Sequence, residues 1–598
     1  MILQALNECY GALAKRGEIS LPGWCDAKVS YALDIDEQGT LHGLIPLKTS
    51  PDGKKEVPRI LRVPEQTGRS SNVCPNFLCN NGEYLLGIDY KGKPQRTRQC
   101  FDAARALHEE LLAAVDSPAA RGVRAFFGSW QPDKAEEHPA LLPYLDDIKK
   151  GANIVLSVDG QYAHEDGATC AAWQAHYAQR SGDAAQGRCL VTGQIAPIAR
   201  LHPSIKGVRD AQSSGAKLVS FNELSFESYG HNKEYGTGQG LNSPVSEQAA
   251  FAYGTALNYL LADREHVQYI GDAAVICWAE DAEPLCQDVF CGSAFGSASE
   301  RITNNELWST VKALAGGGTV SVSGVLLRPE NHFFVLGLAP SASRLSVRFF
   351  LQDTFGSMLS NLLKHYADLE IVKPAYVSHA ELPLWNLLSE TVRQKKKSND
   401  GKKGDDEKNG TAKASPLMAG AVMRAILTGG MYPASLLNNT LIRIRAEQNV
   451  TYGRAAIIQA YYRRLDAPNI PKEVLKVNLD RNTDYMPYLL GRLFAIFEQV
   501  QIASSDTKPN TTIKDRFLKS AAVTPDYVFQ ILIPLNEAHM SKLQRDKAGL
   551  AHMFNKEKQQ VFSLIKTDFP KLMNTHEQNV FYLGYYKQLN HNYKEEDN

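Results

Sequence analysis

The sequence has no hydrophobic run long enough to cross a membrane and no cysteine pattern typical of a metal site. No segment of its 598 residues approaches the roughly 18 uninterrupted apolar residues that a membrane-spanning helix needs. The ten cysteines form no C-x-x-C pair, which fits neither a zinc ribbon nor a disulfide framework. Residues 1–17 include Glu8 and favour an amphipathic helix over a cleavable signal. We therefore expect a cytoplasmic protein without membrane association, metal or other cofactor.

The signatures of several enzyme classes are also missing. The chain has no G-x-x-x-x-G-K-[ST] phosphate loop and no H-E-x-x-H zinc helix. The GTGQG stretch at 236–240 lacks the spacing of a dinucleotide loop, and no P-C-x-x-C follows the His164–Glu165 pair to complete a deaminase zinc site. A hydrolase triad, whose members meet only in space, stays an alternative. We expect no enzymatic activity.

An excess of positive charge is missing as well. Lys and Arg total 65, as do Asp and Glu, so the chain as a whole has no attraction to nucleic acid. Residues 48–98 are locally basic, with ten basic against five acidic residues. That excess is equally typical of a solvated, mixed-charge face. Any nucleic-acid binding must therefore be local.

The texture of the chain changes at residues 394–416, QKKKSNDGKKGDDEKNGTAKASP, which predict a charged flexible linker. Before this linker, residues 332–350 predict two strands joined by a turn, residues 267–280 predict another strand pair, and residues 357–372 predict a helix. After it, apolar residues recur at helical spacing and strand signals disappear. We expect an α+β protein whose mixed α/β first two thirds precede an all-α helical bundle.

These signals suggest four parts. We predict an N-terminal α/β domain over 1–120, a second mixed α/β domain over 121–393, the linker over 394–416 and the helical bundle over 417–598. Eight of the nine methionines lie in the second half of the chain. Methionine fills helical cores, although each could also be an internal start.

Seven blocks rich in glycine, apolar and small polar residues follow one another between residues 69 and 588. They are RSSNVCPNFLCNNGEYLLG, CLVTGQIAPIARLHPSIKGV, GAKLVSFNELSFESYG, LNSPVSEQAAFAYGTALNYLL, VLGLAPSASRLSVRFF, YLLGRLFAIFEQVQ and FYLGYYKQ. No single block is diagnostic. Together, their order and spacing resemble the type I-C CRISPR Cascade large subunit over nearly the whole chain.

The resemblance implies a non-enzymatic subunit of an RNA-guided surveillance complex that acts in antiviral defence. In that family the large subunit recognises the protospacer-adjacent motif in duplex DNA, promotes R-loop formation, stabilises the displaced non-target strand and helps recruit a helicase-nuclease. The implied partners are the backbone and guide-end-binding subunits with their CRISPR RNA, the small subunits, and the target DNA. The C-terminal bundle resembles the small subunit, so an internally translated product from about Met486 is implied. A Val or Leu codon just upstream could serve as the start instead.

Within this framework, residues 201–230 predict a DNA-facing surface. Glycine lets the backbone approach a groove closely, and short polar side chains can donate to or accept from base edges. We expect the LVSF segment, 218–221, to form a buried strand that anchors the surface, with the aromatic residues either stacking on bases or packing in a core. The candidate contacts are Lys206, Arg209 and Lys217 for phosphates, Gln212, Ser213, Ser214 and Asn222 for polar contacts, and Tyr229 for stacking.

The RSSNVCPNFLCNN block, 69–81, is our first choice for reading the flanking duplex, because asparagine can bond adenine edges. An asparagine-rich turn that caps its own backbone is an equal alternative. Phe77 could act as a wedge at a base step or pack in the core. The candidates are Arg69, Ser70, Asn72, Asn76, Phe77 and Asn80.

In the C-terminal bundle, Arg516 and Lys519 predict a basic stripe for a displaced strand or guide duplex. The charge of this part is only weakly positive, so packing against sister subunits is an equal alternative. A structural scaffold that never touches DNA is the second reading of the whole chain, and the hydrolase is the third.

Overall fold

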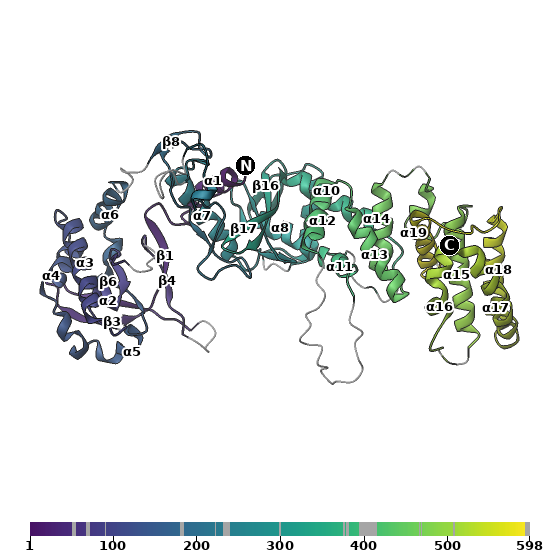
Figure 1. The fold of residues 1–598 in the computed structure, drawn as a ribbon, viewed down its shortest axis with the longest axis horizontal. Helices are drawn as coiled ribbons and strands as arrows, with labels where there is room; N and C mark the ends of the chain where they lie inside the picture. Colours follow the sequence, from purple (N-terminus) through teal and green to yellow (C-terminus); the bar gives the residue numbers. More distant parts are fainter. Residues whose placement is uncertain are drawn as a thin grey trace. The chain divides into compact units, whose positions relative to one another are not determined.

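The computed structural model describes residues 1–50, 56–66, 72–89, 91–179, 185–221, 223–230, 240–297, 301–374, 377, 382–393, 415–465, 467, 469–505, 507 and 509–591. It contains two compact units, whose elements are labelled in Figure 1. Unit 1 comprises Met1–Ser204 and Val219–Tyr259, and unit 2 comprises Ile205–Leu218 and Leu260–Asn598. The short segment Ile205–Leu218 therefore belongs to unit 2, although the residues on both sides of it belong to unit 1.

A mixed five-stranded sheet forms the centre of unit 1. Its order is β3-β2-β6-β5, with β7 paired to β6, and β2 and β6 run parallel. β6 reads NIVLSV and is almost entirely buried, as expected of a central strand with both faces covered. The strands are β2 (Tyr31–Ile35), β3 (Leu41–Pro46), β5 (Cys79–Asn81), β6 (Asn153–Val158) and β7 (Gln161–Tyr162).

Several helices of unit 1 have one apolar face, and among them α2 and α4 pack directly against this sheet. α4 starts where the Ser117 side chain accepts from the Ala120 N–H and Pro118 occupies the first turn, which is the usual chemistry of a helix start. The predicted N-terminal helix is confirmed and buries Leu6 and Leu13. The helices are α1 (Ile2–Lys15), α2 (Gly82–Leu85), α3 (Pro94–Leu112), α4 (Pro118–Ser129), α5 (Leu145–Ile148), α6 (Gly167–Gln179) and α7 (Glu247–Ala262).

Short elements complete unit 1. Two antiparallel pairs are β1 (Trp24–Val29) with β4 (Arg59–Pro64), and β8 (Gln186–Arg188) with β9 (Ile195–Pro197). The 3-10 turns are η1 (Pro132–Glu137), η2 (Leu142–Tyr144), η3 (Ala163–Glu165) and η5 (Leu224–Phe226).

A six-stranded sheet opens unit 2, in the order β10-β11-β17-β16-β13-β12. Its centre confirms the two predicted strand pairs, because long runs of Val, Ile, Leu and Phe in 267–280 and 332–354 form neighbouring antiparallel strands. The strands are β10 (Ser204–Ile205), β11 (Ala216–Lys217), β12 (Gln268–Ile270), β13 (Ala273–Ala279), β16 (His332–Ser341) and β17 (Arg344–Thr354), with a separate hairpin of β14 (Val320–Val322) and β15 (Val325–Leu327).

Helices make up the rest of unit 2, and the described residues from 415 onward contain no strand. The prediction of a mixed α/β region followed by an all-α region is therefore confirmed. The helices are α8 (Pro284–Phe295), α9 (Asn304–Ala315), α10 (Phe355–Leu369), α11 (Leu384–Ser389), α12 (Pro416–Thr428), α13 (Ala434–Glu447), α14 (Tyr452–Arg464), η7 (Lys472–Leu475), α15 (Met486–Ala503), α16 (Ile513–Val523), α17 (Pro525–Asp546), α18 (Ala548–Leu564) and α19 (Thr575–Leu589).

The structure bears on two further sequence predictions, the linker and the LVSF strand. Residues 394–414 of the predicted linker lie outside the described residues, and its last residue, Pro416, already begins α12. The predicted LVSF strand is wrong, because the strand covers only Ala216–Lys217 and residues 218–221 are irregular and half-buried. Among the described helices, none is both long and apolar enough to span a membrane.

Candidate nucleic-acid interface

Residues 205–218 form a short excursion at one edge of the unit 2 sheet. Its anchors are Ile205, Val208 and Ala216, which are buried and hold both ends of the excursion. Gly207 has a φ of 91°, and a Cβ there would lie 3.1 Å from Leu261, so the backbone can pass this point only without a side chain. The excursion is thus pinned at its base while its tip faces solvent.

The basic side chains of this excursion face outward. Lys206 and Arg209 are exposed, and the Arg209 guanidinium stacks 4.0 Å from the centroid of the Tyr269 ring. The Tyr269 hydroxyl donates to the Gly207 carbonyl at 3.3 Å. Stacking holds the guanidinium plane in place while leaving its charge available to an anion.

Lys217 lies deeper than the other two cations. Its backbone N–H donates to the Ser343 carbonyl at 3.0 Å, as part of a parallel pairing with β17. Burial lowers the pKa of Lys217 from its usual value. Its register partner is Arg344, a half-buried cation that the sequence analysis missed. Arg344 directly follows the turn predicted within residues 332–350, and this position was the sequence signal that could have identified it.

The polar candidates of this segment form the tip. Gln212, Ser213 and Ser214 are all exposed, and the Gly215 N–H closes the turn on the Gln212 carbonyl at 2.9 Å. Asp210 is also exposed, with a φ of 63°, and reduces the local positive charge. The excursion therefore presents two exposed cations and three polar side chains on one stretch of backbone, and the Tyr269 ring of β12 stacks on one of these cations.

The second half of the 201–230 region belongs to unit 1. Asn222 lies outside the described residues. Tyr229 is 93% exposed and has a φ of 56°, which is unusual for an aromatic residue. The loop around it is held by Asn242, whose amide donates to the Ser228 hydroxyl at 3.1 Å. The structure thus presents Tyr229 as a surface ring and not as a core residue.

The 69–81 block divides into an exposed end and a buried end. Arg69 and Ser70 lie outside the described residues, and Asn72 is exposed. Asn76 and Asn80 are buried, and the Asn80 amide donates to the Asn76 carbonyl at 3.5 Å. The self-capping turn is thus the alternative that the structure shows for these two asparagines.

Phe77 is fully buried and stacks between two rings, with centroid distances of 5.1 Å to His108 and 5.5 Å to Trp173. Core packing is therefore what the structure shows for this residue. The next residue, Leu78, has a φ of 58°, and its N–H donates to His108 Nε2 at 2.9 Å. His108 Nδ1 donates to the Ala104 carbonyl at 2.7 Å, which fixes the neutral tautomer.

The two C-terminal candidates lie on α16. Arg516 and Lys519 are exposed and three residues apart, so they occupy one face of the helix. The helix start is fixed by Thr512 and Asp515, which form a reciprocal cap. The Lys519 N–H donates to Gln448 Oε1 at 3.2 Å. A small basic face is present, separate from the sheet-edge excursion.

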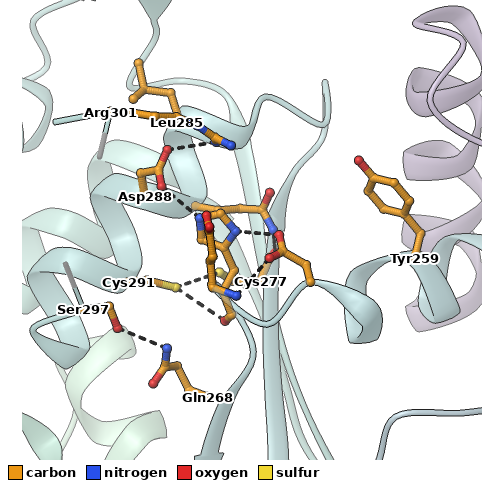
Figure 2. Close-up of polar contacts among 12 residues, drawn as sticks. Tyr259, Gln268, Cys277, Leu285, Asp288, Cys291, Ser297 and Arg301 are labelled. Carbon is orange, nitrogen blue, oxygen red and sulfur yellow. Dashed lines mark hydrogen bonds and ion pairs between the residues drawn. The ribbon is translucent and has the colours of Figure 1, made fainter. Parts of the chain in front are cut away.

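A buried polar network in unit 2 joins residue types that are common in active sites (Figure 2). His266 lies between two carboxylates, with Nδ1 2.6 Å from Asp263 Oδ2 and Nε2 3.0 Å from Asp288 Oδ1. Burial alone would lower the pKa of His266, but the hydrogen bonds to both carboxylates outweigh it and raise the pKa to about 10. Arg301 then pairs with the second Asp288 oxygen at 3.1 Å.

The chemistry of this network is structural. Both ring nitrogens of His266 are occupied as donors, so the ring cannot act as a general base. The neighbouring Cys277 and Cys291 sulfurs are 3.7 Å apart, and burial raises the pKa of Cys277 well above its usual value. The network therefore ties the turn before β12 to α8 and to Arg301.

Two other sequence features were weighed as enzyme motifs. His164 is buried, which lowers its pKa to about 4, and GTGQG lies outside the described residues apart from Gly240. Within the part of the chain that the structure describes, no group of three or more His, Cys, Asp or Glu side chains could hold a metal ion.

Comparison with known proteins agrees with the block pattern. None of the curated proteins matches the chain. The family model described as CRISPR-associated protein (Cas_Csd1) matches residues 6–593, from the first helix to the end of the last one. The match confirms the family predicted from the seven blocks. The chain therefore belongs to the Cas_Csd1 family of CRISPR-associated proteins.

Proposed function

We propose that this Cascade subunit recognises the protospacer-adjacent motif in duplex DNA, promotes R-loop formation and stabilises the displaced strand without catalysing a reaction. The observation that carries the proposal is the excursion at 205–218. It offers Lys206 and Arg209 to phosphates, and its short polar tip has the size to reach a groove edge. Membership of a CRISPR-associated family supports a DNA-binding role for this surface.

We further propose how the other candidates take part. Tyr229 stacks on an unpaired base, since its ring is almost fully exposed. Asn72 is the exposed described residue of the 69–81 block, and the buried residues 76–80 support it. Arg516 and Lys519 contact the displaced strand. CRISPR RNA-bound backbone and guide-end-binding subunits, small subunits and the helicase-nuclease are the proposed partners.

The test measures target-DNA affinity of the guide-loaded complex containing Lys206→Ala/Arg209→Ala. Loss of two phosphate contacts lowers the affinity and makes it less dependent on salt, by about two units in the slope of log K against log salt concentration. We expect at least a tenfold loss at 100 mM salt, on duplexes with and without the correct flanking motif.

The matched control is Lys312→Ala/Arg424→Ala, which removes two exposed cations from α9 and α12 in the same unit. This control should bind like the wild type. Equal affinity and equal salt slope for all three proteins would support the scaffold reading instead. Gln212→Ala then separates the roles, because loss of motif discrimination without loss of salt dependence identifies a base contact.

A further inference from the structure

A cavity of about 560 Å³ lies in the helical part of unit 2, outside the surfaces discussed above. It is lined by the C-terminal end of α14, by the residues that follow it and by η7. Its apolar wall includes Leu465, Ile470 and Leu475. The volume falls within the range of roughly 300–1,000 Å³ found for small-molecule sites.

Three cations line the same cavity. Lys472 and Lys476 are exposed and four residues apart, and among the described residues neither ammonium has an ion-pair or hydrogen-bond partner. The third cation, Arg463, is held rigidly, because its Nε donates to the Leu475 carbonyl at 2.9 Å and its Nη1 to the Asp368 carbonyl at 3.1 Å. These bonds leave the second terminal nitrogen of Arg463 for a ligand.

Acidic groups near the cavity act on Arg463, but none of those described forms an ion pair with the two lysines. The Asp368 carboxylate pairs with Arg464 at 2.6 Å. Glu370 and Glu473 also lie nearby, and within the described part of the chain neither forms an ion pair with Lys472 or Lys476. The ammonium groups of Lys472 and Lys476 and the fixed guanidinium of Arg463 therefore line the cavity and can bind an anion.

A fourth cation lies behind the wall. Lys587 on α19 is fully buried, and its ammonium donates to the carbonyls of Val474 and Lys476, the first at 2.9 Å. Burial and then the charge of Arg463 lower the pKa of Lys587 to about 7. This buried lysine fixes the η7 backbone, and with it the lysines at either end.

We propose that this cavity binds a nucleotide-sized ligand, with a phosphate at Lys472, Lys476 and Arg463 and a flat ring against the apolar wall. Charge-assisted bonds from fixed cations suit a phosphate, and the wall of Leu465, Ile470 and Leu475 suits a base. The same chemistry belongs to a free nucleoside monophosphate and to one nucleotide of a single strand. The inference does not rest on the proposed reading of the flanking motif.

The experiment titrates the full chain with adenosine 5′-monophosphate, inorganic phosphate and a ten-residue oligothymidylate by calorimetry at low salt. The test variant is Lys472→Ala/Lys476→Ala, and the matched control is Lys556→Ala/Lys571→Ala, which removes two exposed lysines elsewhere in the helical part. We expect the test variant to weaken binding of the mononucleotide, the oligonucleotide or both by at least tenfold, with the control unchanged.

Which of the two probes binds more weakly to the test variant identifies the source of the ligand. Weakened mononucleotide binding assigns a free nucleotide, and weakened oligonucleotide binding alone assigns a nucleotide of a strand. Equal binding of both probes by the wild type and the test variant would overturn the proposal. Inorganic phosphate binding as tightly as the mononucleotide would overturn the assignment of a base to the apolar wall.

Discussion

At the scale of single residues, the imidazole of His108 holds the backbone of the 72–81 segment in place. Leu78 has a φ of 58°, a left-handed conformation that costs of the order of 1 kcal/mol for a residue other than glycine. Because this conformation is unfavourable by itself, the hydrogen bond from the Leu78 N–H to His108 helps to maintain it. Only neutral His108 can accept that N–H, because an imidazolium carries protons on both nitrogens. The geometry of this segment therefore depends on the protonation state of a residue 30 positions away.

This dependence predicts a pH effect on stability. Burial lowers the pKa of His108 to about 4, against 6.5 for an exposed histidine. Between pH 4 and pH 6.5, the unfolded chain therefore binds a proton at His108 that the folded chain does not bind. The contribution of His108 to the free energy of unfolding is complete above pH 6.5 and falls by roughly 3 kcal/mol as the pH drops to 4. Urea unfolding at several pH values measures the effect.

The matched variant is His108→Gln, which keeps an acceptor for Leu78 but cannot titrate. Its urea midpoint should change less between pH 6.5 and pH 4 than that of the wild type. The other buried histidines, such as His164 and His365, are present in both proteins and cancel in the difference. Identical pH profiles would show that His108 is not the titrating group.

At the scale of elements, α15 and α19 pack with their backbones in contact. A Cβ on Gly491 would overlap the Phe581 carbonyl and lie 2.8 Å from the Tyr585 nitrogen, while a Cβ on Gly584 would overlap the Tyr488 carbonyl. The two glycines thus face each other's helix, within the blocks YLLGRLFAIFEQVQ and FYLGYYKQ. Their role in these blocks is close approach and not a turn.

This contact predicts that Gly491→Ala is destabilising, although alanine is the better helix former. The added methyl group must push two helix backbones apart, which costs about 3 kcal/mol, whereas helix propensity returns at most about 1 kcal/mol. Thermal unfolding measures the difference. The control is Gly549→Ala on α18, where a Cβ meets nothing within 4 Å and the stability should stay equal or rise. Similar effects of both substitutions would contradict the packing argument.

At the scale of the whole molecule, the chain consists of two units, and the helical end of unit 2 is anchored on residues before Met486. The buried ammonium of Lys587 donates to the carbonyl of Val474. The buried guanidinium of Arg492 donates to the carbonyl of Asp480 at 3.3 Å. An internally started product that begins at Met486 would keep both cations and lose both acceptors.

We therefore predict that a fragment 470–598 is more stable than a fragment 486–598. Lys587 loses both of its acceptors, which costs roughly 2 kcal/mol, whereas Arg492 loses the Asp480 carbonyl and keeps its hydrogen bond to Gln588 at 3.0 Å. Circular dichroism melting of the two purified fragments measures the difference. If Lys587→Met raises the melting temperature of the shorter fragment only, the unpaired cation is the cause. Equal melting temperatures would favour a start at Met486 itself.

Local sequence patterns determined the elements. Runs such as VQYIGDAAVICWAE and HFFVLGLAPSASRLSVRFF specify strand pairs because their partners are adjacent in the chain, and the apolar spacing after residue 415 specifies helices. The order of seven blocks also determined the family, which the family match over residues 6–593 confirms. Lys206, Arg209 and residues 212–214 are exposed, as their polar side chains predict.

Only the tertiary structure decided what the apolar and small polar residues between these elements do. The LVSF segment has the composition of a strand, yet a strand also needs an edge to pair with, and on this side of the sheet β17 pairs with Lys217 and not with residues 218–221. The polarity of Asn76 and Asn80 suggested a surface, but both are buried in a segment whose Leu78 N–H is fixed by His108 on α3. Such outcomes depend on contacts between residues far apart in the chain, which local composition does not encode.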